Sequence, residues 1–134
     1  MTKVDREGTV FVLEDDAEVR ESLTALLEAM GLRTRAFACG RDIVRSAATL
    51  VDGCLLLDIG LPDYDGFEVL RMLREADVDL PAIFMTGDEV NAARAPVRGS
   101  GARVVLRKPI SDTVLLATLA DVLGGEKRAE GACA

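Results

Sequence analysis

The stretch VFVLEDDAEVR, residues 10–20, runs from a short apolar segment straight into three acids. Val10–Leu13 reads as a buried strand, and Glu14, Asp15 and Asp16 follow at the point where that strand ends. Carboxylates crowded together repel one another, and a divalent cation is the simplest way to neutralise them. The stretch therefore predicts a core strand whose carboxyl end carries a site for a positive ion.

The composition describes a single acidic domain. The 134 residues suit one domain with a proper core, and 49% of them are hydrophobic, which argues against a disordered chain. The net charge of −7 argues against nucleic acid as the main partner, because neutralising phosphates needs an excess of Lys and Arg. The N-terminus MTKVDREG is too polar for a signal peptide, and no apolar run approaches the roughly 20 residues that cross a bilayer. We therefore expect a cytoplasmic protein without a membrane segment.

Histidine and cysteine chemistry is restricted in this chain. There is no histidine, which excludes a histidine-based catalytic centre. The three cysteines, Cys39, Cys54 and Cys133, are odd in number and lack the spacing of metal ligands. We expect reduced thiols, with Cys54 buried in a strand.

Five segments of strand length are spaced along the chain, and all of them except the second are apolar. They are Val10–Leu13, Arg33–Phe37, Cys54–Leu57, Leu80–Met85 and Val104–Leu106. The third is apolar without alternation, which is typical of a strand covered on both faces. It stops at Asp58, a second acid placed at the end of a strand.

Helical patterns separate these strands. The first helix has five apolar side chains on one face: Val19, Leu23, Leu26, Leu27 and Met30. Gly31 is expected to end it, and a second helix is predicted over Arg41–Leu50. Asp65 and Glu68 have the spacing of a capping box at the start of a third helix, and Ser111 is expected to cap the last one.

Strands that alternate with helices predict an α/β fold. Five of each form a doubly wound parallel sheet with helices on both faces. In such sheets a ligand binds beyond the carboxyl ends of the strands, where the strand order reverses. The polar residues that end four of the predicted strands should therefore meet at one edge: Glu14, Asp15, Asp58, Thr86 and Lys108.

Each of these residues alone has an ordinary structural explanation, but together they suit phosphoryl transfer. Asp16 is expected only to cap the first helix. Oxygen ligands with room for water suit Mg²⁺, and a carboxylate beside that ion can attack phosphorus to form an acyl phosphate. Thr86 could donate a hydrogen bond to a phosphoryl oxygen. Lys108 could pair with the carboxylate before transfer and with the phosphoryl group afterwards.

The chain resembles the receiver domains of two-component response regulators, the CheY-like superfamily. Four motifs carry the resemblance, in order and spacing: VLEDD at residues 12–16, LLLDIGLPDYDG at 55–66, FMTG at 84–87 and LRKPI at 106–110. The resemblance implies a flavodoxin-like fold with five parallel strands in the order 2-1-3-4-5. It covers about Thr9–Leu123, so we expect an N-terminal extension at residues 1–8, a receiver domain at 9–124 and a flexible tail at 125–134.

The resemblance also implies a role for the acids. Asp58 would be phosphorylated by a partner histidine kinase, and Mg²⁺ would be held by Glu14, Asp15, Asp58 and the backbone carbonyl of Gly60. The chain would then be a phosphoacceptor signalling domain with at most slow autophosphatase activity, not a metabolic enzyme.

The switch elements follow from the same resemblance. Thr86 and Lys108 would bind the phosphoryl group and report its presence, and the peptide bond before Pro109 would be cis. Val105 stands three residues before Lys108, where the family has Tyr or Phe, so the usual swing of an aromatic ring must be muted or replaced. Asp88, two residues beyond Thr86, would influence how fast water removes the phosphoryl group.

The expected contact surface comprises the fourth helix, the fifth strand and the last helix, and it would bind a downstream target or a second copy of the chain. The segment AARAPVRGSG, residues 92–101, predicts a short fourth helix because it contains proline and glycine. Four arginines near it are either solvated or form a docking patch: Arg94, Arg98, Arg103 and Arg107. The last helix carries two apolar stripes, which either both lie inside one monomer or leave one for a homodimer.

Two rival functions stay open. A Mg²⁺-dependent phosphotransferase resembling haloacid dehalogenases would have a second Asp two residues after the nucleophile, whereas this chain has Gly60. A degenerate receiver acting by protein contact alone would lack some of the chemical residues, and all of them are present. The sequence does not choose between a stand-alone receiver and part of a longer regulator.

Overall fold

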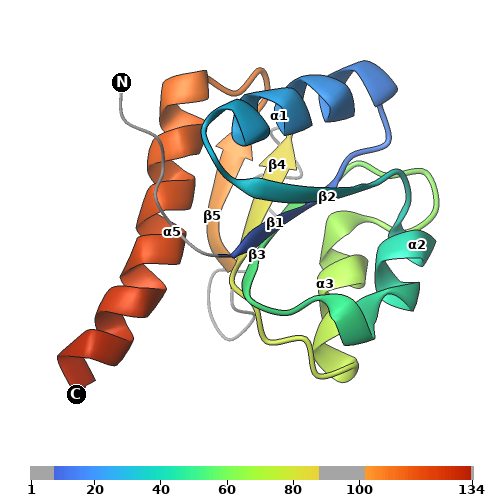
Figure 1. Ribbon diagram of the computed structural model, residues 1–134. Coiled ribbons are helices and arrows are strands. Elements are labelled where there is room, and N and C mark those ends of the chain that lie inside the picture. Colours follow the sequence, from blue (N-terminus) through green and yellow to red (C-terminus); the bar gives the residue numbers. More distant parts are fainter. Residues whose placement is uncertain (1–7, 88–101, 134) are drawn as a thin grey trace.

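The computed structural model (Figure 1) describes residues 8–87 and 102–133, and the side chains of residues 8–87 and 105–124. Its centre is one five-stranded parallel sheet in the order β2-β1-β3-β4-β5, as predicted. The strands are β1 (Thr9–Leu13), β2 (Arg33–Phe37), β3 (Gly53–Asp58), β4 (Ala82–Thr86) and β5 (Ala102–Arg107).

Helices cover both faces of the sheet (Figure 1). They are α1 (Ala17–Ala29), α2 (Gly40–Arg45), the single-turn 3₁₀ helix η1 (Ala47–Thr49), α3 (Gly66–Glu75) and α5 (Asp112–Cys133). α1 and α5 pack on one face, and α2 and α3 pack on the other. This arrangement is the doubly wound, flavodoxin-like fold expected from the sequence.

The central strand β3 divides the core into two clusters. Cys54 and Leu56 face α1 and α5, whereas Leu55 and Leu57 face α2 and α3, and every residue of the strand is buried. Successive side chains of a strand point to opposite faces, so a strand with helices on both sides has no polar face. The predicted burial of Cys54 is confirmed.

The predicted helix ends are confirmed by hydrogen bonds. The Asp16 side chain accepts from the backbone N–H groups of Glu18 and Val19 at the start of α1. At its other end, Gly31 has a φ of 89°, the left-handed conformation that favours glycine.

The later helices begin as predicted too. Asp65 and Glu68 form a complete capping box on α3, and the Ser111 hydroxyl accepts from the backbone N–H of Val114 in α5.

Two predicted helices have different lengths in the structure. The helix expected over Arg41–Leu50 is α2 followed by η1, because the hydroxyls of Ser46 and Thr49 donate to nearby backbone carbonyls and compete with a longer helix. A flexible tail was expected from residue 125, but α5 continues to Cys133. The residues after the two glycines include strong helix formers and no proline, so the backbone can continue as a helix. The flexibility expected for residues 125–134 stays a prediction.

Both apolar stripes of α5 are buried within one chain. Leu115, Leu119 and Val122 are at most 5% exposed, and Leu116 and Leu123 are only 8% and 6% exposed. The monomer alternative is therefore the one observed, and the second stripe gives no reason to expect a homodimer.

Some predictions fall outside the part of the chain that the structure describes. These are the short fourth helix at residues 92–101, Asp88, Arg94, Arg98 and the side chain of Arg103. Arg107 is described and is exposed at the end of β5. Among the described residues no helix is long and apolar enough to span a membrane.

The burial of β3 on both faces of the sheet allows a test by stability measurements. Leu56 has no exposed surface, so replacing it with Ala should lower the free energy of unfolding by about 2–5 kcal/mol, the range for cavities in a packed core. The matched control is Val114→Ala on α5, where the side chain is 48% exposed and the change should stay within about 0.5 kcal/mol. Urea unfolding of both variants checks this, and equal losses would contradict the described core.

Candidate functional site

The parallel sheet brings the predicted polar residues to one edge. Leu13 and Leu57 are register partners on β1 and β3, so the residues that follow them, Glu14 and Asp58, end neighbouring strands side by side. Thr86 ends β4, the next strand, and Lys108 follows directly after β5. The edge is the carboxyl end of the sheet, as expected.

Three of these polar residues are buried, which is uncommon unless they are paired. Glu14 is 1% exposed, Asp58 is 4% exposed and Thr86 is 2% exposed. They are the only buried polar or charged residues among the described ones. Asp15, in contrast, is exposed.

Lys108 joins the two buried acids. Its Nζ donates to Glu14 Oε1 at 2.6 Å and to Asp58 Oδ2 at 3.1 Å. Its backbone N–H donates to the Thr86 carbonyl at 2.8 Å, which fixes the start of the loop that carries the side chain. The ammonium thus neutralises two carboxylates that come from different strands.

The remaining oxygens of the two buried acids are held by the backbone. Asp16 N–H donates to Glu14 Oε2, and Gly60 N–H donates to Asp58 Oδ1, each at 3.1 Å. In the described part of the chain no buried side-chain nitrogen or oxygen lacks a hydrogen-bond partner. The orientation of both carboxylates is therefore fixed on every side that the protein covers.

The acids can hold a divalent cation. Carboxylate oxygens of Glu14, Asp15 and Asp58 lie within 4.8 Å of one another. These three carboxylates and the Lys108 ammonium leave the set with two negative charges. An all-oxygen site of this charge, with one acid open to water, fits Mg²⁺.

Arg20 belongs to the site but was not predicted. It lies on α1, and its guanidinium donates to the backbone carbonyls of Glu14 at 2.9 Å and Asp15 at 3.4 Å. It thus holds the turn that carries two candidate metal ligands. Its position within the VLEDDAEVR stretch gave no sign of this contact, because a bond to a backbone carbonyl depends on the turn and not on residue type.

The loop after Asp58 packs closely against the end of β3. Gly66 N–H donates to the Ile59 carbonyl at 3.0 Å, and Ile59 N–H donates to the Met85 carbonyl at 2.9 Å. A Cβ on Gly66 would lie 2.7 Å from the Asp58 carbonyl oxygen. Gly60, in contrast, has open space where a Cβ would be.

The structure also describes Pro109 and Val105, two further residues that the sequence singled out. The Lys108–Pro109 peptide bond is cis. Val105 is partly buried and packs against the cluster formed with α2 and α3, opposite Phe84 in the register of β4 and β5. The Phe84 ring makes an edge contact with Phe67, with centroids 4.9 Å apart.

Burial and charge act in opposite directions on the pKa of Lys108. Partial burial alone would lower it, but the hydrogen bonds and charges of Glu14 and Asp58 outweigh that effect and raise it above its usual value. Lys108 therefore keeps its positive charge at neutral pH.

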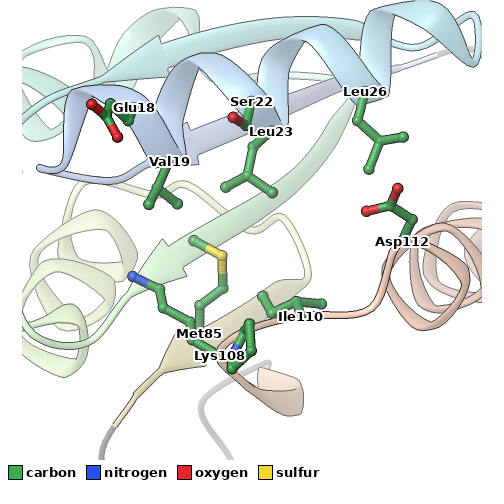
Figure 2. A pocket seen from close by; sticks show the side chains of 10 residues that line it. Glu18, Val19, Ser22, Leu23, Leu26, Met85, Lys108, Ile110 and Asp112 are labelled. Carbon is green, nitrogen blue, oxygen red and sulfur yellow. The ribbon is translucent and has the colours of Figure 1, made fainter.

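A pocket of about 650 Å³ opens next to this site (Figure 2). Apolar side chains of α1 face Met85 and Ile110 across it, and Lys108 lies at its wall. It is lined by Glu18, Val19, Ser22, Leu23, Leu26, Met85, Lys108, Pro109, Ile110 and Asp112. The pocket combines an apolar floor with two acids at its margin.

Comparison with known proteins gives one consistent family. Residues 10–120 match the model of the response regulator receiver domain. Nodulation protein W of Bradyrhizobium diazoefficiens is 35% identical over 115 residues, which are 86% of this chain and 51% of that protein. The transcriptional regulatory protein TdiR of Thauera aromatica is also 35% identical, over 86% of this chain and 51% of that protein. The chain thus spans about half the length of the curated relatives it matches.

Solved structures agree with these relatives. Full-length FixJ from B. japonicum matches with a TM-score of 0.83 and 27% identity, over 94% of this chain and 62% of that one. The BeF3-activated DrrB receiver domain matches with a TM-score of 0.73 and 25% identity, over 87% of this chain and 97% of that one.

Two glycines of the loop after Asp58 provide a matched pair of variants. Gly66→Ala places a Cβ 2.7 Å from the Asp58 carbonyl oxygen and 2.9 Å from the Ile59 Cα, and backbone cannot easily move aside. We expect a loss of about 1–3 kcal/mol in the free energy of unfolding, only partly offset by the helix preference of Ala. Gly60→Ala meets nothing within 4 Å and should be nearly neutral. Thermal or urea unfolding checks this, and a harmless Gly66→Ala would show that the loop is not packed as described.

The raised pKa of Lys108 predicts how stability changes at alkaline pH. Its ion pairs stabilise the fold fully below the unfolded value of 10.5, and this contribution is lost as pH rises through the folded pKa. The variant Lys108→Met lacks the contribution at every pH. The difference in unfolding free energy between wild type and variant should be constant from about pH 7 to 10 and shrink at higher pH. Urea titrations across this range measure it, and a difference that stays constant to about pH 12 would contradict the pairing.

Proposed function

Because the chain belongs to the family of response regulator receiver domains, we propose that a histidine kinase phosphorylates it on Asp58 in the presence of Mg²⁺. The observation that carries this proposal is the pairing of the buried Asp58 with Lys108 and Glu14 at the carboxyl edge of the sheet. A buried carboxylate with fixed orientation, a neighbouring ammonium and a set of metal-binding oxygens is what an aspartyl phosphate site needs.

The residues divide the chemistry among them. An Asp58 carboxylate oxygen attacks the phosphorus of the donor phosphohistidine, a new P–O bond forms, and the P–N bond breaks with its electron pair going to the imidazole. Glu14, Asp15 and Asp58, together with the Gly60 carbonyl, would hold a Mg²⁺ ion, which would neutralise phosphoryl charge.

Lys108 and Thr86 act after the transfer. The Lys108 ammonium moves from the oxygens of Glu14 and Asp58 to the new phosphoryl oxygens, because a phosphoryl group carries more negative charge than one carboxylate. Thr86, buried at the end of β4, donates its hydroxyl to the same group. These shifts at β4 and β5 carry the signal toward the surface of the predicted fourth helix, β5 and α5. Val105, the register partner of Phe84, offers no aromatic ring to move with them, so the usual ring swing is muted or replaced.

The pocket beside Lys108 suits the approach of the kinase. Its walls come from α1 and from the segment between β5 and α5, and it adjoins the residue that bonds Asp58. A helix with an apolar stripe and basic flanks would fit the apolar floor and the acids Glu18 and Asp112. A donor histidine on that helix would then stand near Asp58.

The output and the setting complete the proposal. Residues 9–124 act as the receiver unit in the cytoplasm, and they bind no nucleic acid themselves. The downstream partner is either a further segment of a longer regulator, as in relatives of about twice the length, or a separate protein.

Incubation with acetyl phosphate tests the proposal. With millimolar Mg²⁺ the wild-type protein should gain one phosphoryl group by intact mass, and Asp58→Asn should gain none, because an amide is not a comparable nucleophile. Without Mg²⁺ the wild-type gain should disappear. Multiple turnover of small phosphoesters would instead indicate a phosphotransferase, and no uptake by the wild type would indicate a receiver that acts by contact alone.

A further inference from the structure

Asp63 ties the loop that follows Asp58 to the start of α2. Its Oδ1 accepts from the backbone N–H of Gly40 at 3.1 Å, and its Oδ2 accepts from that of Arg41 at 3.0 Å. Oδ1 also accepts from the N–H of its own neighbour Tyr64 at 2.8 Å. One carboxylate therefore joins two segments that are more than 20 residues apart in sequence.

The start of α2 depends on this carboxylate. Cys39, at the N-cap position, makes no side-chain hydrogen bond to the helix, so Asp63 supplies the acceptors that a cap residue would otherwise supply. Gly40 allows the close approach, because a Cβ there would lie 2.7 Å from Val69 Cγ2 and 3.3 Å from Asp63 Oδ1.

The charge of Asp63 strengthens the contact. Slight burial tends to raise its pKa, but the backbone N–H donors of Arg41, Tyr64 and Gly40 outweigh that effect and lower the pKa below its usual value. The side chain is thus an ionised carboxylate at neutral pH, and bonds from N–H groups to an ionised acceptor are stronger than bonds between neutral groups.

The same loop carries the groups that the proposed chemistry needs. It runs from Asp58 through Gly60 to Asp65, where the capping box attaches it to α3. A Cβ on Gly60 would meet nothing within 4 Å, so no neighbouring group packs against that side of the turn. Backbone bonds of Ile59 and Gly60 hold the turn on the side of β3, and the bonds of Asp63, three residues after Gly60, hold the loop on the other side.

We propose that Asp63 is a positioning residue for metal binding and phosphoryl transfer at Asp58, because its bonds to Gly40 and Arg41 hold the loop that follows Asp58 and carries the Gly60 carbonyl. This inference rests on the proposed function. It goes beyond that function, because it gives α2 an effect on Mg²⁺ affinity although α2 carries none of the reacting groups. Residues that orient metal ligands commonly affect metal affinity by about 10–100-fold.

The test compares three variants of the full chain. Asp63→Ala removes both acceptors, and Asp63→Asn keeps one carbonyl oxygen for one of the two N–H groups. Asp42→Ala removes an exposed carboxylate from the first turn of the same helix and serves as the matched control. Mg²⁺ affinity is measured by calorimetry, and hydrogen exchange of the Gly40 and Arg41 amides reports whether the contact is lost. Tyr64 is the only tyrosine and there is no tryptophan, so fluorescence also reports on this loop.

We expect Asp63→Ala to raise the Mg²⁺ dissociation constant about tenfold and to speed exchange of both amides. Phosphorylation by acetyl phosphate should slow at low Mg²⁺ and recover at saturating Mg²⁺, a split that a general loss of stability would not produce. Asp63→Asn should show a two- to threefold weakening, on the order of the loss of one acceptor. Asp42→Ala should match the wild type.

The outcomes separate this inference from the function it rests on. If the wild type neither binds Mg²⁺ nor takes up phosphoryl, both the proposed function and the inference fail. If the wild type binds Mg²⁺ and takes up phosphoryl, and folded Asp63→Ala binds Mg²⁺ equally well although its Gly40 and Arg41 amides exchange faster, only the inference fails. Asp63 would then serve stability alone. If Asp63→Ala does not fold, Asp63→Asn takes its place. The inference then fails if Asp63→Asn binds Mg²⁺ as tightly as the wild type while the amide of Gly40 or Arg41 exchanges faster.

Discussion

The pairing of one ammonium with two buried carboxylates is the constraint on which the site depends. Lys108 bonds both Glu14 and Asp58, and these residues come from three strands that are far apart in sequence. Removing one partner from a buried ion pair costs about 3–5 kcal/mol, because the other charge stays buried without compensation. The arrangement therefore holds the strand ends together and leaves the acids short of positive charge. The site therefore favours a ligand that brings positive charge, such as a divalent cation.

The rest of the structure keeps this edge rigid. Backbone N–H groups hold the outer oxygens of Glu14 and Asp58, and Arg20 holds the turn after β1. The double burial of β3 fixes the strand that ends at Asp58, and the helices on each face supply caps and anchors for the loops. Asp63 extends these supports to α2, so that a helix without reacting groups still bears on the geometry of the loop.

Local patterns predicted most of the fold. The strands, the caps at Asp16 and Asp65 and the turn at Gly31 depend on periodicity and on residues within a few positions, so the sequence contains them directly. The meeting of the polar residues at one edge followed from a rule of parallel sheets. The predicted ends of α2 and α5 were wrong. Hydroxyl-to-backbone bonds shorten α2, and helix-forming residues after two glycines extend α5, and each effect is only about 1 kcal/mol. The contacts of Arg20 with the turn just before α1 and of Asp63 with distant backbone could not be predicted, since their partners are backbone groups that every residue has.

A crystal structure with Mg²⁺ and a fluoroberyllate group as the phosphoryl mimic tests the role of the Lys108 ion pairs most directly. We expect an ion bound by carboxylate oxygens of Glu14 and Asp15, the mimic on an Asp58 oxygen, and Lys108 Nζ moved from Glu14 to the mimic. A structure soaked with both, in which no ion is bound and Lys108 still bridges Glu14 and Asp58, would contradict this expectation.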